Sequence, residues 1–171
     1  MTAFKGLRPS EMDRTTFVAT FADIYEHSPW VAEQVFDQGG TAGLDEVEAL
    51  HRRMSQVLLS ADQPAQLALI NAHPDLAGKA AVQGELTASS TSEQAGAGIH
   101  QCTPEEFRRF TELNTAYKAR FGFPFIMAVK GSDRHQILAA FERRIHHSAE
   151  AEFDCALAEI NKIALFRLQA L

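Results

Sequence analysis

The sequence is poor in cysteine, in basic charge and in long hydrophobic runs. Its two cysteines, Cys102 and Cys155, lie far apart and form no Cys-x-x-Cys motif, so a disulfide framework is not expected. Sixteen Lys and Arg residues against 22 Asp and Glu give a formal net charge of −6, which argues against a nucleic-acid-binding surface. No apolar run approaches the roughly 20 residues of a membrane helix, and residues 1–14 lack a signal-peptide core. We therefore expect a cytoplasmic protein that binds neither nucleic acid nor a membrane.

Length and hydrophobic patterning predict a single all-α domain covering residues 1–171. Apolar residues recur at helical spacing through most of the chain, and no βαβ alternation or repeat interrupts them. Residues 84–100, rich in Gly, Ser, Thr and Ala, predict a loop or a loop leading into a short helix capped by Ser90 or Ser92. Pro124 prevents a continuous helix through the apolar residues 121–131, which we expect to form a buried extended connector.

Two polar residues in the middle of the chain are candidates for chemistry, each with a structural alternative. His73 lies at a predicted helix end, where Pro74 restrains the backbone and the helix C-terminus stabilises a protonated imidazole. It is therefore either a rigidly positioned proton donor or a C-capping histidine. Glu93 is surrounded by small residues that let backbone N–H groups approach a ligand. The alternative for Glu93 is an ordinary capping box with Ser90.

Arg167 lies on the apolar stripe of the last predicted helix, where a guanidinium must find an anion or extend to water. Its two-pronged head suits a carboxylate or a urea-like ligand, but a structural ion pair accounts for the position equally well. No metal site is predicted: there is no HExxH motif, and Glu142, His146 and Glu150 are spaced as in a solvated helix face. No glycine-rich nucleotide-binding motif is present either.

Five segments, taken together and in this order, resemble the 2-oxo-4-hydroxy-4-carboxy-5-ureidoimidazoline decarboxylases, a family of uric acid breakdown that yields (S)-allantoin. They are YEHSPWVAE (25–33), INAHPDLAGKAA (70–81), SSTSEQAGAGI (89–99), LNTAYKARFGFPFIMAVKG (113–131) and EINKIALFRL (159–168). The resemblance covers the chain from about residue 10 to residue 168, and its motifs are very specific in combination. The departures are small. Ile99 replaces a leucine that is frequent in the family, and the sequence of residues 88–90, shortly before Glu93, differs from the family pattern.

The resemblance implies an all-α carboxy-lyase without cofactor or metal, which acts as a homodimer on a small ureidoimidazoline substrate. It implies His73 as the catalytic histidine, Glu93 as its acidic partner and Arg167 as the arginine that orients the substrate. Further substrate contacts are implied for Pro74, for Ser90, Thr91, Ser92 and Gln94, and for Phe125, Ile126, Met127, Ala128 and Val129. The imidazole, the carboxylate and the guanidinium should then converge on one dry cleft. The ending Gln169-Ala170-Leu171 is not a peroxisomal tripeptide, which again favours the cytoplasm.

Two other interpretations remain open at this point. An all-α decarboxylase or peroxidase of the carboxymuconolactone type would need, in its antioxidant members, a redox group that Cys102 and Cys155 do not supply. A non-enzymatic helical module could bind ureides or other purine-derived ligands through Arg167 and Gln94. Such a module would show saturable binding without turnover.

Overall fold

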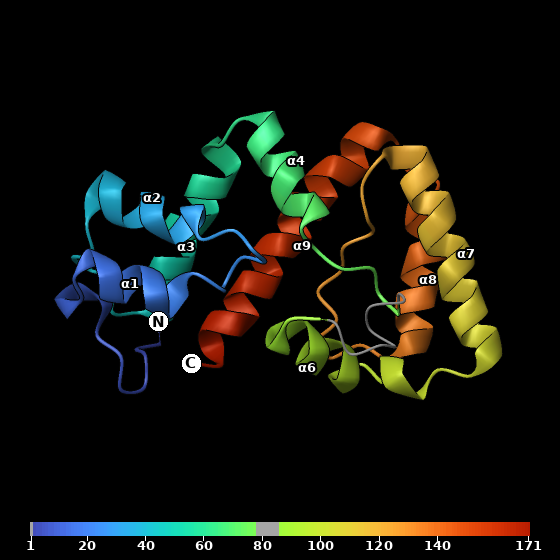
Figure 1. Cartoon of the computed structure of the whole chain (residues 1–171), viewed down its shortest axis with the longest axis horizontal. Helices are drawn as coiled ribbons and strands as arrows, with labels where there is room; N and C mark the ends of the chain where they lie inside the picture. The colour runs from blue at the N-terminus through green and yellow to red at the C-terminus, as the bar shows by residue number, and fades with distance from the viewer. Residues whose placement is uncertain (1, 78–85) are drawn as a thin grey trace. The chain divides into compact units, whose positions relative to one another are not determined.

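The computed structural model describes residues 2–77 and 86–171, and this part of the chain is all-α, as predicted (Figure 1). Its β structure is limited to an isolated bridge between Ala3 and Glu46. The last four residues of the 70–81 segment lie outside the described residues. The α-helices are α1 (Arg14–Phe21), α2 (Trp30–Gly39), α3 (Val47–Ser60), α4 (Gln63–Asn71), α6 (Ala88–Gly96), α7 (Pro104–Phe121), α8 (Arg134–Arg144) and α9 (Ala149–Gln169), with short 3₁₀ turns at Pro9–Glu11 and Ile99–Gln101.

The chain divides into two compact units. The first unit comprises Met1–Ala72 and Ile160–Leu171, and the second comprises His73–Glu159. Helix α9 therefore begins in the second unit and ends in the first. None of the described helices is long and apolar enough to cross a membrane. The prediction of one domain over residues 1–171 stays a prediction.

Helix starts follow local side-chain hydrogen bonds, and one of them differs from the prediction. Thr103 and Glu106 form a capping box at the start of α7, each accepting a hydrogen bond from the other's backbone N–H. Asp13 caps α1. The expected cap of α6, Ser90 or Ser92, is wrong, because Thr87 caps this helix by accepting a hydrogen bond from the N–H of Ser90. Glu93 consequently lies in the second turn of α6 rather than at its N-terminus.

The first unit buries the apolar stripes of α1–α4 together with the end of α9. Phe17 and Phe21 of α1 are fully buried and their ring centroids are 4.9 Å apart. Across the unit, the Tyr25 hydroxyl donates a hydrogen bond to Oδ1 of Asn161 on α9 at 2.7 Å. Burial of Tyr25 raises the pKa of its hydroxyl. This hydroxyl therefore stays protonated and available as a donor at neutral pH.

The second unit is organised around the ring of Tyr117 on α7. The rings of Phe123, Phe125 and Phe141 meet it edge-on, with centroids within 6.0 Å. Residues 122–133 return the chain from the end of α7 to the start of α8, so the two helices lie side by side and run in the same direction (Figure 1). This return contains all but the first residue of the FGFPFIMAVKG segment, and among the described residues the segment has no strand partner. The predicted buried extended connector is confirmed for residues 124–129, most of which are buried.

A buried ion pair lies beneath this connector. Glu152 of α9 is 0% exposed, and its Oε1 accepts hydrogen bonds from Nε of Arg144 at 3.0 Å and from the Tyr117 hydroxyl at 2.6 Å. The half-exposed His147 lies with Nδ1 3.0 Å from the other carboxylate oxygen. Burial by itself acts to raise the pKa of Glu152, but the hydrogen bonds from Tyr117 and Arg144 and the charge of Arg144 outweigh it. The pKa of Glu152 is therefore below its ordinary value of 4.5.

The lowered pKa of Glu152 predicts a loss of stability in acid. A carboxyl whose pKa is lower in the folded than in the unfolded state stabilises the fold at pH values above its unfolded pKa. That contribution disappears as the pH falls through the folded-state pKa, so the free energy of unfolding should decline below about pH 4.5. Urea unfolding between pH 7 and pH 3 measures this decline. A Glu152→Gln variant should be less stable at pH 7 and should decline less, and an equally steep decline would contradict the prediction.

Candidate active site

His73 lies just beyond α4, in a short loop of residues 73–77 that we call the histidine loop. Helix α4 ends at Asn71, its C-cap is Ala72, and His73 is nine-tenths buried at the start of the second unit. The backbone of Ala77 at the far end of the loop is left-handed, with φ of 53°. A non-glycine residue in this conformation is strained by about 1–2 kcal/mol, so other contacts must stabilise the loop.

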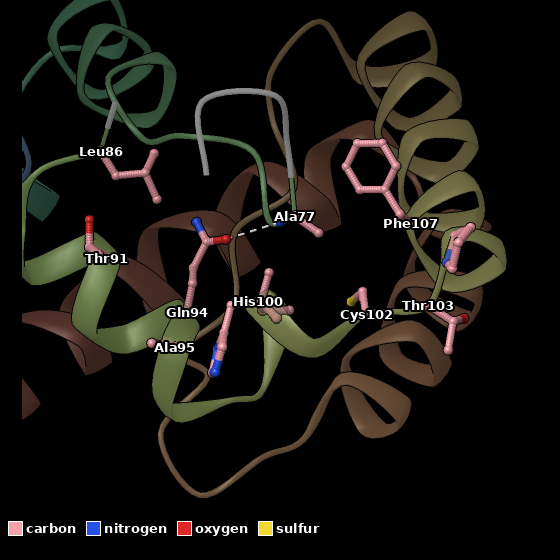
Figure 2. A pocket seen from close by; sticks show the side chains of 11 residues that line it. Ala77, Leu86, Thr91, Gln94, Ala95, His100, Cys102, Thr103 and Phe107 are labelled. Carbon is pink, nitrogen blue, oxygen red and sulfur yellow. Dashed lines mark hydrogen bonds between the residues drawn. The ribbon is translucent and has the colours of Figure 1, made fainter. Parts of the chain in front are cut away.

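Gln94 of α6 supplies two of these contacts. Its Oε1 accepts a hydrogen bond from the N–H of Ala77 at 3.0 Å, and its Nε2 donates to the carbonyl of Asp75 at 3.3 Å (Figure 2). Both ends of the buried Gln94 amide are thus used within the protein. Sequence reasoning predicts a substrate contact for Gln94. In the structure this side chain fixes the strained end of the histidine loop.

Helix α7 supplies the other contacts of the histidine loop. Nδ2 of the buried Asn114 donates to the carbonyl of Leu76 at 2.9 Å, and Nζ of Lys118 lies 2.7 Å from Oδ2 of Asp75. Sequence reasoning missed both residues. A signal for Asn114 was present, because a lone amide lies among the helically spaced apolar residues Phe110, Leu113 and Tyr117, but no spacing rule identifies its partner.

Replacing Gln94 by leucine should destabilise the second unit. The substitution leaves the N–H of Ala77 and the carbonyl of Asp75 without their partner, and each buried unpaired group costs about 1–3 kcal/mol. We expect a clear drop in the urea midpoint of unfolding. Gln38→Leu is the matched control, because the exposed amide of Gln38 on α2 has, within residues 2–77 and 86–171, a single partner in Gln34, at 3.3 Å. Equal midpoints for the two variants would contradict the anchoring role of Gln94.

The predicted substrate turn, residues 90–94, forms the middle of α6. Ser90 and Gln94 are buried, Glu93 is partly exposed, and Thr91 and Ser92 are exposed. A cavity of about 500 Å³ lies between α6 and the start of α7 (Figure 2). Its lining includes Thr91 and Gln94 of the predicted site and is otherwise largely apolar, with Leu86, Ile99 and Phe107. His73 and Glu93 are not among its lining residues.

Residues 125–129, which we call the substrate wall, have an unusual backbone. Phe125 and Ile126 are 1% and 3% exposed, and Val129 is buried as well. Within the described part of the chain, only two backbone groups of this segment have a hydrogen-bond partner. The carbonyl of Ile126 accepts from Arg144, and that of Val129 accepts from the N–H of Ser132. Met127 and Ala128 are partly exposed, so the remaining N–H and C=O groups of this largely apolar segment are suited to a polar ligand.

Arg167 forms a buried ion pair in the first unit. Its Nη2 donates to Oε2 of Glu26 at 2.7 Å, and its Nη1 lies 3.3 and 3.4 Å from the carbonyls of Asp23 and Ile24. The structure therefore shows an ion pair for Arg167, and a role of this residue in substrate binding stays a prediction. Sequence reasoning missed Glu26, because 141 positions separate it from Arg167.

The structure brings part of the predicted site together. Gln94 contacts the histidine loop directly, and helix α7 contacts both that loop and the ring of Phe125. His73, Pro74, Ser90, Thr91, Ser92, Glu93, Gln94 and the substrate wall belong to the second unit, whereas Arg167 belongs to the first. The convergence of Arg167 with His73 and Glu93 therefore stays a prediction. Among residues 2–77 and 86–171, no cluster of three or more His, Cys, Asp or Glu side chains could bind a metal ion.

Comparisons with known proteins agree with the motifs. The sequence profile of the family described as OHCU decarboxylase matches residues 10–169. The 2-oxo-4-hydroxy-4-carboxy-5-ureidoimidazoline decarboxylase of Haloferax volcanii is 41% identical over 159 residues, which cover 93% of this chain and 90% of the relative. A crystal structure of (S)-allantoin synthase matches 94% of this chain with a TM-score of 0.76 and 31% identity, and this chain spans 51% of that one. A crystal structure of OHCU decarboxylase in the presence of (S)-allantoin matches 86% of this chain and 93% of its own, with a TM-score of 0.68 and 22% identity, and supports the fold.

Proposed function

This chain belongs to the OHCU decarboxylase family, and from that premise we infer its function. It is a carboxy-lyase that decarboxylates 2-oxo-4-hydroxy-4-carboxy-5-ureidoimidazoline (OHCU) to (S)-allantoin in the degradation of urate. The carboxymuconolactone-type enzyme and the non-catalytic ureide binder are set aside by this family membership. The assignment of individual residues to steps of the reaction is the further part of the proposal.

The observation that carries the proposed site is the unpaired backbone of the substrate wall. OHCU has a ureido group and a ring amide, whose N–H and C=O groups alternate as they do along a peptide. The N–H and C=O groups of Phe125, Met127 and Ala128 have no partner within the described residues, so they can pair with those ends of the substrate. The neighbouring side chains of Phe125 and Ile126 are apolar and buried, which excludes water from the bound substrate.

The substrate itself supplies the electron sink for decarboxylation. The carbon that carries the carboxylate and the hydroxyl adjoins a ring C=N bond conjugated to the ureido group. When the bond to CO₂ breaks, its electron pair forms a new C=C bond and the ring nitrogen gains a proton. The product of this step is an enol with two nitrogens on the neighbouring carbon. No thiamine or pyridoxal group is needed for this chemistry.

Arg167 has the role of orienting the substrate in this proposal. Its guanidinium would bind an anionic or carbonyl oxygen so that the carboxylate stands out of the ring plane and the breaking bond overlaps the π system. Binding the carboxylate equally strongly in the ground state and in the transition state would not accelerate the reaction. The contribution of Arg167 to the rate is therefore the orientation of the substrate. Nη2 of Arg167 already donates to Glu26. All N–H groups of a guanidinium lie in one plane, so this bond fixes the orientation of the whole group. Glu26 therefore limits the directions in which Arg167 can donate.

His73 and Glu93 manage the protons in this proposal. The hydroxyl proton must leave as that oxygen becomes the carbonyl of allantoin, and Glu93 with His73 would accept it. His73 would then add a proton to the ring carbon that carries the ureido nitrogen, from one face only, which sets the S configuration. Proton transfer by a positioned group of this kind contributes about 10²–10⁴-fold to the rate. The contacts from Gln94, Asn114 and Lys118 to the histidine loop support the fixed approach that one-sided protonation requires.

The proposed function is tested by turnover of freshly generated substrate. Urate is oxidised and the product is hydrolysed enzymatically in the cuvette, and this protein is then added while circular dichroism follows the allantoin formed. We expect a rapid dichroic signal of one sign, against a slow racemic background without the protein. A protein that bound the substrate without accelerating formation of optically active allantoin would refute the function.

The resemblance also implies a homodimer in the cytoplasm, and light scattering on the purified chain tests the oligomeric state.

A further inference from the structure

Among the described residues, Arg144 is the one side chain that hydrogen-bonds to the backbone of the substrate wall. The Nη1 atom of this arginine donates to the carbonyl of Ile126 at 2.7 Å, and its guanidinium carbon lies 4.3 Å from the centre of the Phe125 ring. Arg144 is therefore bonded to the backbone of one wall residue and packed on the side chain of the residue before it. Within the described residues, the other backbone groups of residues 125–129 form a single hydrogen bond, in which the carbonyl of Val129 accepts from the N–H of Ser132.

The far side of the Arg144 guanidinium is fixed by the buried carboxylate of Glu152. Nε of Arg144 donates to Oε1 at 3.0 Å, and Nη2 lies 3.0 Å from the same oxygen. Glu152 in turn accepts from the Tyr117 hydroxyl on α7. The guanidinium thus links α8 to α9 and to the wall through Nε, Nη1 and its flat face, and α7 joins through the bond of Tyr117 to Glu152.

Stability alone is a poor reason for burying this pair. Taking two charges out of water offsets most of their attraction, and well-packed apolar residues of similar volume stabilise a core as well or better. A buried pair does fix geometry, because hydrogen bonds are directional in a way that apolar contacts are not. The wall needs such fixing, since it is not helical and has no strand partner among the described residues.

We propose that Arg144 is a positioning residue for substrate binding, and that it sets the backbone of residues 125–129 at the spacing the ureido and amide ends of the substrate require. This role rests on the proposed function. Arg144 acts through the wall, because its Nη1 donates to the carbonyl of Ile126 and its Nε donates to Glu152. The wall pairs with substrate ends that are remote from the reacting carbon. Loss of Arg144 should therefore weaken the binding of the substrate and of the transition state equally. Such a loss raises KM and leaves kcat nearly unchanged.

The test variant is Arg144→Lys. Lysine keeps the positive charge beside Glu152, so the carboxylate is not left unpaired and the fold is preserved. A single ammonium cannot reach Glu152 and the Ile126 carbonyl together, nor stack flat on Phe125. His147→Gln is the matched control, because it removes another contact of Glu152, at 3.0 Å, without touching the wall. Steady-state kinetics and hydrogen–deuterium exchange of the peptide covering 123–130 are measured for both variants and the wild type.

The expected result for Arg144→Lys is a KM about tenfold higher with kcat within about twofold of the wild type, equivalent to the loss of one good hydrogen bond. Amide exchange should rise in residues 123–130 and stay unchanged elsewhere. An unchanged KM, or a raised KM in His147→Gln as well, would overturn the positioning role. A fall in kcat of Arg144→Lys, together with faster amide exchange throughout the second unit, would also overturn it, because that result indicates a general loss of structure. A wild type without turnover would instead refute the proposed function.

Discussion

Replacing His73 by asparagine should lower kcat by at least about 100-fold and abolish the optical activity of the product. Asparagine fills a similar space and can form hydrogen bonds, but it cannot exchange a proton near neutral pH. His73 is nine-tenths buried in a loop fixed from two helices, so its removal should leave the neighbouring backbone in place. Allantoin would then form only by the unassisted route, whose protonation has no preferred face. Circular dichroism of the product, together with total allantoin, separates loss of rate from loss of stereochemistry.

His135→Asn is the control for this experiment. His135 lies on α8 with a side chain that is 68% exposed, and its only close charged neighbour among the described residues is Glu106 at 3.5 Å. Turnover in this variant should match the wild type. If His73→Asn still produced (S)-allantoin at a comparable rate, His73 would have no part in the proton transfer. The fixed histidine loop would then need another explanation.

The fold was predictable where its causes are local. The capping box at the start of α7 depends on two residues three positions apart, Thr103 and Glu106. The extended connector follows from a single proline, Pro124, which cannot continue a helix. The predicted cap of α6 was wrong for an equally local reason. Ser90 and Ser92 are good capping residues, but Thr87 is one as well, and it caps the helix by accepting from the N–H of Ser90. Choosing between such neighbours depends on packing that the pattern does not contain.

The contacts that fix the candidate site were not predictable, because they join residues far apart in the chain. Asn114 reaches Leu76 across 38 positions and Arg144 reaches Ile126 across 18. A partial signal exists for Arg144, which continues the apolar stripe of Ile137 and Phe141 at helical spacing. A charged residue on such a stripe indicates a buried partner, but the sequence does not say which one. The motif resemblance predicts which groups react, whereas the contacts that position the candidate site required coordinates.

Replacing Glu26 by leucine should destabilise the protein by about 3–5 kcal/mol, because it leaves the Arg167 guanidinium buried without its carboxylate. The side chains of the two residues are 2% and 7% exposed, so water cannot take the place of the missing partner. Urea unfolding measures the loss. Asp37→Leu is the matched control, because it breaks an ion pair with Arg14 whose side chains are about half exposed. Such exposed pairs contribute about 0–1 kcal/mol, and equal effects of the two variants would show that the pair of Glu26 and Arg167 is hydrated.

The double variant Glu26→Leu/Arg167→Met separates the two roles of Arg167. It removes both charges at once, so most of the stability lost in Glu26→Leu should return. The bonds from Arg167 to the carbonyls of Asp23 and Ile24 are long, at 3.3 and 3.4 Å, and their loss should cost little. Turnover should nevertheless stay at least about 100-fold below the wild type, because nothing in the double variant orients the substrate. A stable double variant that still produced (S)-allantoin at the wild-type rate would leave Arg167 with a structural role alone.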